Sequence, residues 1–221
     1  MEPRSPYGIV VGDPLFDALQ KKDPKVTGYA VNYPASFALD SKVKGAADVV
    51  AHLESQSKTC PDQKYVLVGY SQGADVMHGA SVQLKADMYP RVIGFVLFGD
   101  PGNRGPNVRS PLGGTVPPLP KELAEKLMEN CAPGDPVCTG SGTKVADHLV
   151  YVENPWISDS VAYIQKQLET GGKAGPKPSP NGGEKDKATA ANEAALSELG
   201  VMLGGTKDQL SALAGKGGKG A

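Results

Sequence analysis

The prediction of the fold class starts from the stretch Tyr65-Val66-Leu67-Val68-Gly69-Tyr70-Ser71-Gln72-Gly73. It begins with an apolar run typical of a buried strand, and the small-residue stretch from Ala74 to Leu84 that follows favours a helix. The Gly-x-Ser-x-Gly pattern between them is typical of a strand-to-helix turn that exposes a nucleophilic serine. The pattern alone also fits an ordinary turn with a serine at the helix N-terminus. Ser71 is therefore a candidate nucleophile that needs support from the rest of the chain.

A serine nucleophile needs a base, and two histidines follow Ser71. His78 lies about two helical turns along the same predicted helix, so it cannot easily fold back to the serine oxygen. We interpret it as an ordinary helix histidine. His148 lies far enough along the chain to return on a loop, and it is the predicted general base.

Three aspartates between the serine and the base could orient the imidazole. Asp147 is the immediate neighbour of the histidine, which makes it too close to hold that ring comfortably. Asp100 opens an Asp-Pro-Gly-Asn sequence that fits a turn equally well. Asp135 lies in a short loop bracketed by Cys131 and Cys138, where a disulfide would fix the loop geometry. The same loop also fits a structural staple with an exposed turn aspartate.

Three motifs together resemble the cutinase family of small secreted serine esterases. They are Gly69-Tyr70-Ser71-Gln72-Gly73, the Cys-x-x-Gly-Asp-Pro-Val-Cys-Thr-Gly-Ser run from Cys131 to Ser141, and His148-Leu149-Val150-Tyr151. The resemblance covers roughly Glu2 to Leu168. It implies a small α/β-hydrolase of the flavodoxin-like type, in which helices cover both faces of a parallel sheet in three α/β/α layers.

Residue by residue, the resemblance implies Ser71 as nucleophile, Asp135 as orienting acid and His148 as general base. It also implies the Gln72 backbone N–H as an oxyanion donor. The expected reaction is hydrolysis of cutin-type polyester, or of short-chain or lipid esters, through an acyl-enzyme on Ser71. Plant-attacking cutinases carry apolar residues just before the histidine, whereas this chain has Gly142-Thr143-Lys144 there, which weakens the case for waxy polyester. Acetylxylan esterase is the alternative, because that sister branch shares the serine motif.

The N-terminus departs from the family pattern. Cutinases begin with a central strand ending near R-G-[ST]-x-E, and this chain starts inside that motif, at Met1-Glu2. We therefore expect the first strand and the second oxyanion donor to be missing. Family members bond the equivalent of Cys60 to an upstream cysteine, so Cys60 is expected to be unpaired. A catalytically impaired relic or a surface-binding protein is the alternative of another class; the presence of all three triad residues argues against it.

Composition narrows the classes of partner and location. A formal net charge of -1 makes no electrostatic case for nucleic acid. No apolar run approaches the ~18 residues of a membrane span, and no signal peptide is visible. The family resemblance nevertheless predicts that the natural full-length protein is extracellular. Nothing indicates a cofactor, and the cysteines and histidines lack the spacing of a metal site. We expect a monomer acting on an ester substrate, including polymers such as cutin or an acetylated polysaccharide.

Two regions are predicted along the chain. Residues 1–169 form the cutinase-like domain, and residues 170–221 form a Gly/Ala/Lys/Pro-rich tail with a short helix near Ala188 to Leu203. The predicted helices lie near Val10–Lys22, Ser41–Ser57, Ala74–Leu84 and Ser158–Leu168. The predicted strands lie near Thr27–Asn32, Tyr65–Val68, Val92–Phe98 and Leu127–Cys131. This alternation argues for a parallel sheet covered on both faces.

Overall fold

The centre of the molecule is a parallel three-stranded sheet, in a computed structural model that describes residues 7–178 except 37 and 39. The strands are β1 (Tyr65–Tyr70), β2 (Val92–Phe98) and β3 (Leu127–Asn130), in the order β1-β2-β3. Tyr70 pairs with Phe98, and Phe98 pairs with Asn130, so the three strands end level with one another. The segments that leave the carboxyl ends of the strands therefore start from one edge of the sheet, where ligands of parallel sheets usually bind.

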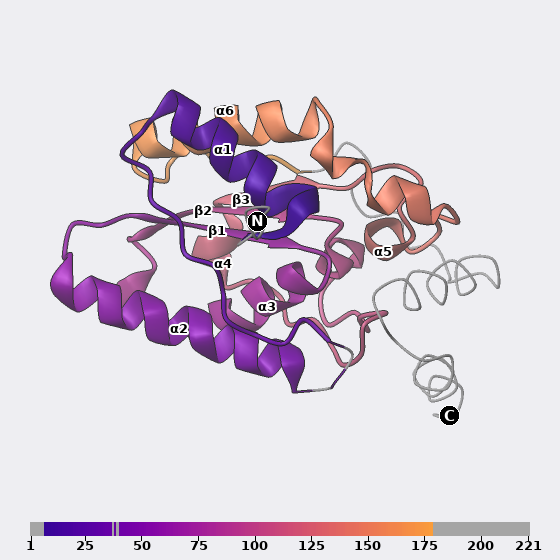
Figure 1. Ribbon diagram of the computed structural model, residues 1–221. Coiled ribbons are helices and arrows are strands. Elements are labelled where there is room, and N and C mark those ends of the chain that lie inside the picture. Colours follow the sequence, from indigo (N-terminus) through magenta and orange to yellow (C-terminus); the bar gives the residue numbers. More distant parts are fainter. Residues whose placement is uncertain (1–6, 37, 39, 179–221) are drawn as a thin grey trace, which may run out of the picture.

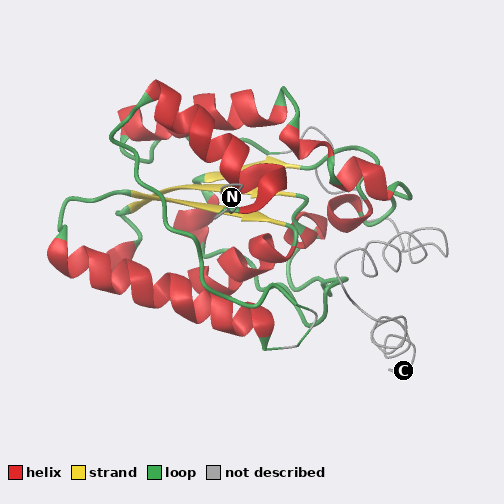
Figure 2. Cartoon of the chain, in the orientation of Figure 1, coloured by secondary structure: helices red, strands yellow, loops and turns green. Residues whose placement is uncertain are grey.

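Helices cover both faces of the sheet, which makes three layers (Figure 1). The π-helix Gly8–Gly12, α1 (Asp13–Lys22) and α6 (Trp156–Thr170) lie on one face, and α2 (Ser41–Thr59) and α3 (Gln72–Ser81) lie on the other. The remaining short helices are Ala86–Met88 (η2), Pro101–Arg104 (η3), α4 (Lys121–Ala124), α5 (Pro136–Thr139), Val145–His148 (η4) and Val150–Val152 (η5). Figure 2 shows the strands enclosed between these helical layers.

The apolar sequence of β2 explains why the sheet is covered on both sides. Every residue of this strand is buried, and successive side chains point to opposite faces. Phe95 and Leu97 pack with the α2 and α3 side, whereas Val96 and Phe98 pack with the α1 and α6 side. A strand buried on both faces is typical of a parallel sheet in an α/β domain. The predicted fold class is confirmed in these layers.

One predicted strand is wrong. Residues 26–32 form no strand, and this segment instead runs beside α2. Asp48 on α2 accepts hydrogen bonds from the Tyr29 hydroxyl (2.9 Å) and the Asn32 backbone N–H (2.8 Å). Apolar, β-favouring residues form a strand only where a neighbouring strand completes the ladder, and here a helix side chain takes the backbone hydrogen bond instead. The other helices and strands predicted within residues 7–178 are present, with ends that differ by a few residues.

The start of the predicted tail packs against the domain. Lys177 donates its N–H to the Leu127 carbonyl (2.8 Å) and accepts from the Glu129 N–H (2.9 Å), so it extends the sheet beside β3. Gln167 on α6 holds the intervening turn through the Ala174 N–H (3.1 Å). The division after residue 169 stays a prediction, and the predicted helix near Ala188 to Leu203 lies outside the described residues. Within the described part, no helix combines the length and apolar character needed to cross a membrane.

Candidate active site

Ser71 occupies a sharp turn between β1 and α3. Its φ of 54° and ψ of -117° lie in a region that costs energy for any residue with a side chain. The turn is held from both sides, because the Ser71 N–H donates to the Phe98 carbonyl of β2 (3.0 Å) and its carbonyl accepts from the Ala74 N–H (2.9 Å). Gly69 is required here, since a Cβ would lie 2.5 Å from the Gly73 carbonyl oxygen. The sequence motif therefore forms the strained turn that it predicts.

Asp135 lies in the loop after β3, at the N-terminus of α5. One carboxylate oxygen, Oδ1, accepts from the Val137 N–H (2.7 Å), and the other, Oδ2, lies 2.8 Å from His148 Nδ1. Both side chains of this pair are buried, with exposed fractions of 0% and 1%. A disulfide joins Cys131 to Cys138 and closes the loop around the carboxylate, as predicted. The structure thus brings Asp135 and His148 together.

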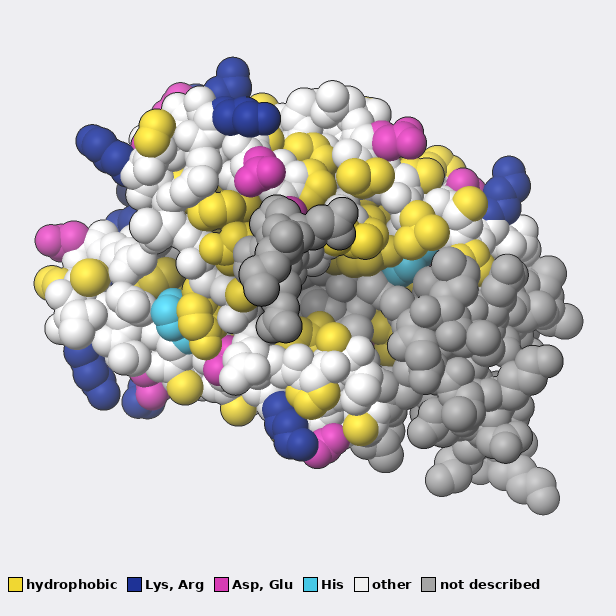
Figure 3. Space-filling model, viewed as in Figure 1, with side chains coloured by type: hydrophobic (Ala, Val, Ile, Leu, Met, Phe, Trp, Pro, Cys, Tyr) yellow, Lys and Arg dark blue, Asp and Glu magenta, His cyan; other side chains and the backbone are white. Residues whose placement is uncertain are grey.

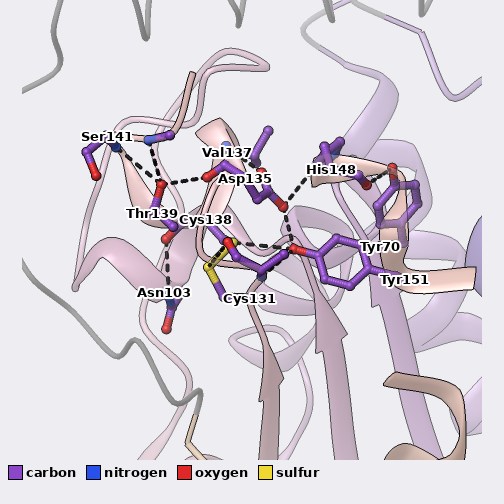
Figure 4. Close-up of polar contacts among 12 residues, drawn as sticks. Tyr70, Asn103, Cys131, Asp135, Val137, Cys138, Thr139, Ser141, His148 and Tyr151 are labelled. Carbon is purple, nitrogen blue, oxygen red and sulfur yellow. Dashed lines mark hydrogen bonds and ion pairs between the residues drawn. A yellow bond between two sulfur atoms is a disulfide. The ribbon is translucent and has the colours of Figure 1, made fainter. Parts of the chain in front are cut away.

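Two tyrosines that the sequence analysis left without a role complete this arrangement (Figure 4). The Tyr151 hydroxyl donates to Asp135 Oδ2 and accepts from the Ala132 N–H (3.0 Å). Burial, and then the charge of Asp135, raise the pKa of Tyr151, so the hydroxyl stays neutral and can donate. Tyr70 stacks on the His148 ring with centroids 4.9 Å apart and donates to the His148 carbonyl (2.7 Å). In the sequence, the only indication of this role of Tyr151 was its position three residues after the histidine.

The orientation of His148 leaves its second ring nitrogen available. Because the Asp135 carboxylate accepts from Nδ1, that nitrogen carries the hydrogen and Nε2 carries the lone pair. Neither His148 Nε2 nor Ser71 Oγ forms a hydrogen bond with any described residue. The two atoms therefore form no hydrogen bond with each other either. An imidazole nitrogen with an unused lone pair can act as a base and a serine hydroxyl as a nucleophile, and the catalytic roles of these residues stay a prediction.

The other two candidate aspartates have different partners. Asp100 pairs with His78, whose Nε2 lies 2.8 Å from Asp100 Oδ2. His78 is therefore more than the ordinary helix histidine of the sequence analysis, because it belongs to a second buried pair. Asp147 packs on the Asp135 loop at Gly134, where a Cβ would collide with Asp147 Oδ2.

Gln72 is the first residue of α3, and its side chain reaches away from the helix. Nε2 donates to the Ser36 carbonyl (2.9 Å), and Oε1 accepts from the Ser41 hydroxyl (3.4 Å). These contacts connect the serine turn to the segment before α2. The backbone N–H groups of a helix N-terminus attract negative charge. The oxyanion role of the Gln72 N–H stays a prediction.

Metal chemistry has no evident location in this arrangement. Among residues 7–178, with 37 and 39 excepted, no group of three His, Cys, Asp or Glu side chains could hold a metal ion. Cys60 is exposed and unpaired, as expected.

A parallel sheet with a serine at such a turn and a buried His–Asp pair defines an α/β-hydrolase with the parts of a serine hydrolase. Residues 3–168 match the family model of Cutinase. The chain therefore belongs to the cutinase family, and the resemblance seen in the sequence is confirmed.

Individual relatives agree with this assignment. The carboxylesterase Culp1 of Mycobacterium tuberculosis is 33% identical over 167 residues, which cover 73% of this chain and 75% of that protein. The cutinase cut1 of Trichoderma harzianum is 33% identical over 165 residues, covering 73% of this chain and 60% of its own length.

Solved structures give the same picture. A Trichoderma reesei cutinase bound to a phosphonate inhibitor has a TM-score of 0.58 and 32% identity, covering 73% of this chain and 69% of its own. An acetylxylan esterase has a TM-score of 0.59 and 27% identity, covering 71% and 89%. The chain is a cutinase-like serine ester hydrolase, and the acetylxylan alternative is not better supported by these comparisons.

Proposed function

We propose that this protein hydrolyses carboxylic esters through a Ser71–His148–Asp135 triad. One observation carries the assignment: His148 Nδ1 is held by Asp135, while His148 Nε2 and Ser71 Oγ have no hydrogen-bond partner among the described residues. Structural serines and histidines that are buried are normally hydrogen-bonded. A hydroxyl and an imidazole nitrogen without partners, together with a carboxylate that orients the imidazole, therefore support a catalytic role.

In the proposed reaction, Ser71 Oγ attacks the ester carbonyl carbon while His148 Nε2 takes the serine proton. The carbonyl oxygen becomes an oxyanion that accepts a hydrogen bond from the Gln72 backbone N–H. Collapse of the tetrahedral intermediate breaks the carbon–oxygen bond to the alcohol, which leaves with the proton from His148. A water molecule, activated by His148, then attacks the acyl-enzyme, releasing the acid and returning the proton to Ser71. Asp135 holds Nδ1 and stabilises the imidazolium throughout.

The surface near the histidine supports esters with an apolar acyl chain of short to medium length. Leu149 and Val152 follow His148 and are 37% and 47% exposed, so apolar surface faces solvent there. The preceding loop contributes exposed Thr143 and Lys144, which disfavour a waxy polymer. Figure 3 shows one face on which hydrophobic side chains gather in the middle and charged ones lie mostly along the rim. We therefore propose short-chain or lipid esters as substrates.

We propose that the protein acts outside the cell. The Cys131–Cys138 disulfide supports this location, because structural disulfides form and persist in oxidising compartments. We further propose that the catalytic unit is a monomer that needs no cofactor, since the proposed reaction uses only side chains and backbone groups of one chain.

The test is hydrolysis of p-nitrophenyl acetate, butyrate and octanoate by the purified protein and by Ser71→Ala. We expect kcat to fall by about 10⁴-fold or more in Ser71→Ala, because the acyl-enzyme cannot form. Ser158→Ala is the matched control, since its hydroxyl is exposed and contacts only the Pro155 carbonyl. A phosphonate ester should label the native protein once, at Ser71, as read by mass spectrometry.

Retained hydrolysis by Ser71→Ala, or labelling of another residue, would contradict the triad. Preference for butyrate or octanoate over acetate is the expected result for the proposed substrate class. Release of acetate from acetylated xylan without hydrolysis of butyrate would instead establish the acetylxylan alternative.

A further inference from the structure

A second buried His–Asp pair lies directly beside the proposed catalytic pair. The turn that leaves β2, residues 99–102, separates the two. A Cβ on Gly99 would lie 2.6 Å from His148 Cε1 and 2.9 Å from Asp135 Oδ2. A Cβ on Gly102 would lie 2.6 Å from His78 Nε2. The backbone of this turn therefore packs closely against both pairs.

The hydrogen-bond partners of His78 determine its charge. Nδ1 lies 2.8 Å from the Pro117 carbonyl, which can only accept, so Nδ1 carries a hydrogen. Nε2 lies 2.8 Å from Asp100 Oδ2 and carries a second hydrogen when Asp100 is ionised. Burial lowers the pKa of His78, but the charge and hydrogen bond of Asp100 raise it by more, and the net direction is upward. Acceptors at both ring nitrogens favour the imidazolium form of His78.

Glu129 on β3 adds a third acidic group to this cluster. Its side chain is buried, and burial, followed by the charge of Asp100, raises the pKa of Glu129 well above its usual range. The charge of Asp135 acts in the same direction. A side-chain hydrogen bond between Glu129 and Asp100 contributes to this raised pKa, and Asp100 also accepts from the Gly102 N–H (2.7 Å). Asp100 thus lies between His78 on one side and Glu129 on the other.

Other charged groups face this cluster from neighbouring elements: one is an ion pair, and the other is an arginine that donates to the Pro101 and Arg109 carbonyls. Asp75 on α3 binds Lys42 of α2 (2.8 Å) and accepts from the Ser110 hydroxyl (2.6 Å). Arg104, at the end of the η3 turn, lies close enough for its charge to interact with Asp75 and Asp100. The charge of His78 compensates Asp100 through a direct contact, whereas the Asp75 charge already has the ammonium group of Lys42 beside it.

We infer that His78 and Glu129 are positioning residues for ester hydrolysis: they clamp and neutralise Asp100, and thereby hold the Gly99 backbone against the His148–Asp135 pair. This inference rests on the proposed triad. The contacts of His78 and Glu129 with Asp100 fix the Gly99 backbone beside His148. They also leave Asp135 as the uncompensated negative charge that acts on His148. Neither residue touches the substrate or the reacting atoms.

The first experiment removes the positive charge with His78→Gln. We expect kcat for p-nitrophenyl butyrate to fall about 10-fold with little change in KM, because small misplacements of a base are costly. The acid-side midpoint of kcat/KM should rise by about half a pH unit, since an uncompensated Asp100 favours a protonated base nearby. The double variant His78→Gln/Asp100→Asn should restore that midpoint, because it removes both charges.

Glu129 is tested with a conservative and a disruptive substitution. Glu129→Gln keeps a neutral donor and should retain kcat within about 2-fold, whereas Glu129→Leu removes the donor and should lower kcat as His78→Gln does. A purely structural role would lower the melting temperature of these variants but leave kcat per folded molecule and the pH midpoint unchanged. That outcome would overturn the inference.

A measurement on the native protein covers the case in which the variants fail to fold. Side-chain ¹⁵N shifts distinguish a doubly protonated imidazole from a neutral one, and the chain has only 3 histidines. The His78 resonances, assigned by elimination with His52→Gln and His148→Gln, should show both nitrogens protonated at pH 8. A neutral His78 at that pH would overturn the inference whatever the activity assays give. Failure of the triad itself would appear separately, as activity in Ser71→Ala.

Discussion

The two buried His–Asp pairs, His148–Asp135 and His78–Asp100, have the same contact distance of 2.8 Å and nearly the same burial, yet they are suited to different tasks. In the first pair, one ring nitrogen meets the carboxylate and the other has no partner among the described residues. In the second pair, the Pro117 carbonyl accepts from the remaining nitrogen. A base needs a free lone pair, which only the first histidine has.

The carboxylates differ in the same way. Asp135 accepts from a backbone N–H, from the neutral Tyr151 hydroxyl and from its histidine, and the nearby disulfide braces its loop. Asp100 accepts from the Gly102 N–H, contacts His78 Nε2 and lies beside the buried Glu129, whose pKa it raises. A His–Asp contact is therefore weak evidence for catalysis, and the partner of the second ring nitrogen is the informative feature.

The largest expected effect comes from replacing the histidine of each pair. His148→Gln should lower kcat for p-nitrophenyl butyrate by about 10⁴-fold or more, because the glutamine amide cannot take the serine proton. The same substitution at His78 should cost about 10-fold, through positioning alone. Steady-state kinetics of both variants, with His52→Gln as control, measures the difference. Equal losses at the two histidines would show that the pairs do not differ in function.

The next effect concerns the carboxylates. Asp135→Asn should lower kcat by roughly 10³–10⁴-fold, because an amide donor favours the imidazole tautomer with hydrogen on the wrong nitrogen. Asp100→Asn is the matched change in the other pair and should cost far less, since it removes a charge that His78 already compensates. Activity at pH 8 is the appropriate measurement. A larger loss for Asp100→Asn would place the orienting acid in the wrong pair.

The disulfide offers a smaller effect, on stability. Replacing Cys131 and Cys138 by serine opens a short closed loop and should lower the free energy of unfolding by about 2–3 kcal/mol. The loop that carries Asp135 should loosen with it, so kcat should fall while the His78 environment stays unchanged. Urea unfolding and kinetics report the two parts. Cys60→Ser, at an exposed unpaired cysteine, is the control and should change neither. Unaltered stability in the double variant would show that the loop needs no brace.

The smallest effect is a pH dependence of stability. Glu129 has a raised pKa in the folded state, so between its usual value near 4.5 and the folded value the folded state holds a proton that the unfolded state releases. Stability should therefore fall as pH rises through this interval, and His78 adds a similar fall above its usual value near 6.5. Urea titrations between pH 5 and 8 should show a shallower decline for Glu129→Gln. Identical slopes would mean that Glu129 is ionised in the native protein.

The sequence predicted the structure well where that structure depends on residues close together in the chain. The serine turn, the strand before it and the helix after it are all present, because glycines and an apolar run specify them within ten residues. The prediction of a strand at Thr27–Asn32 was wrong because a strand depends on a distant partner strand. This segment instead forms hydrogen bonds with Asp48 of α2. Tyr151 escaped notice because its hydroxyl meets Asp135 only after β3 and the 3₁₀ turns have folded.

Residue order alone was enough to predict the fold class, the family, and the identities of Ser71, Asp135 and His148 as a candidate set, since short motifs carry that information. Spacing along the chain favoured His148 over His78 and left Asp100 and Asp135 open as the acid. The tertiary structure pairs each histidine with one aspartate, because the level carboxyl ends of β1, β2 and β3 bring distant loops to one edge of the sheet. At this edge, the lack of a side chain on Gly99 leaves room for the contact between His148 and Asp135, whereas Asp100 contacts His78. Which pairs form depends on distances across the sheet, and these do not follow from spacing along the chain.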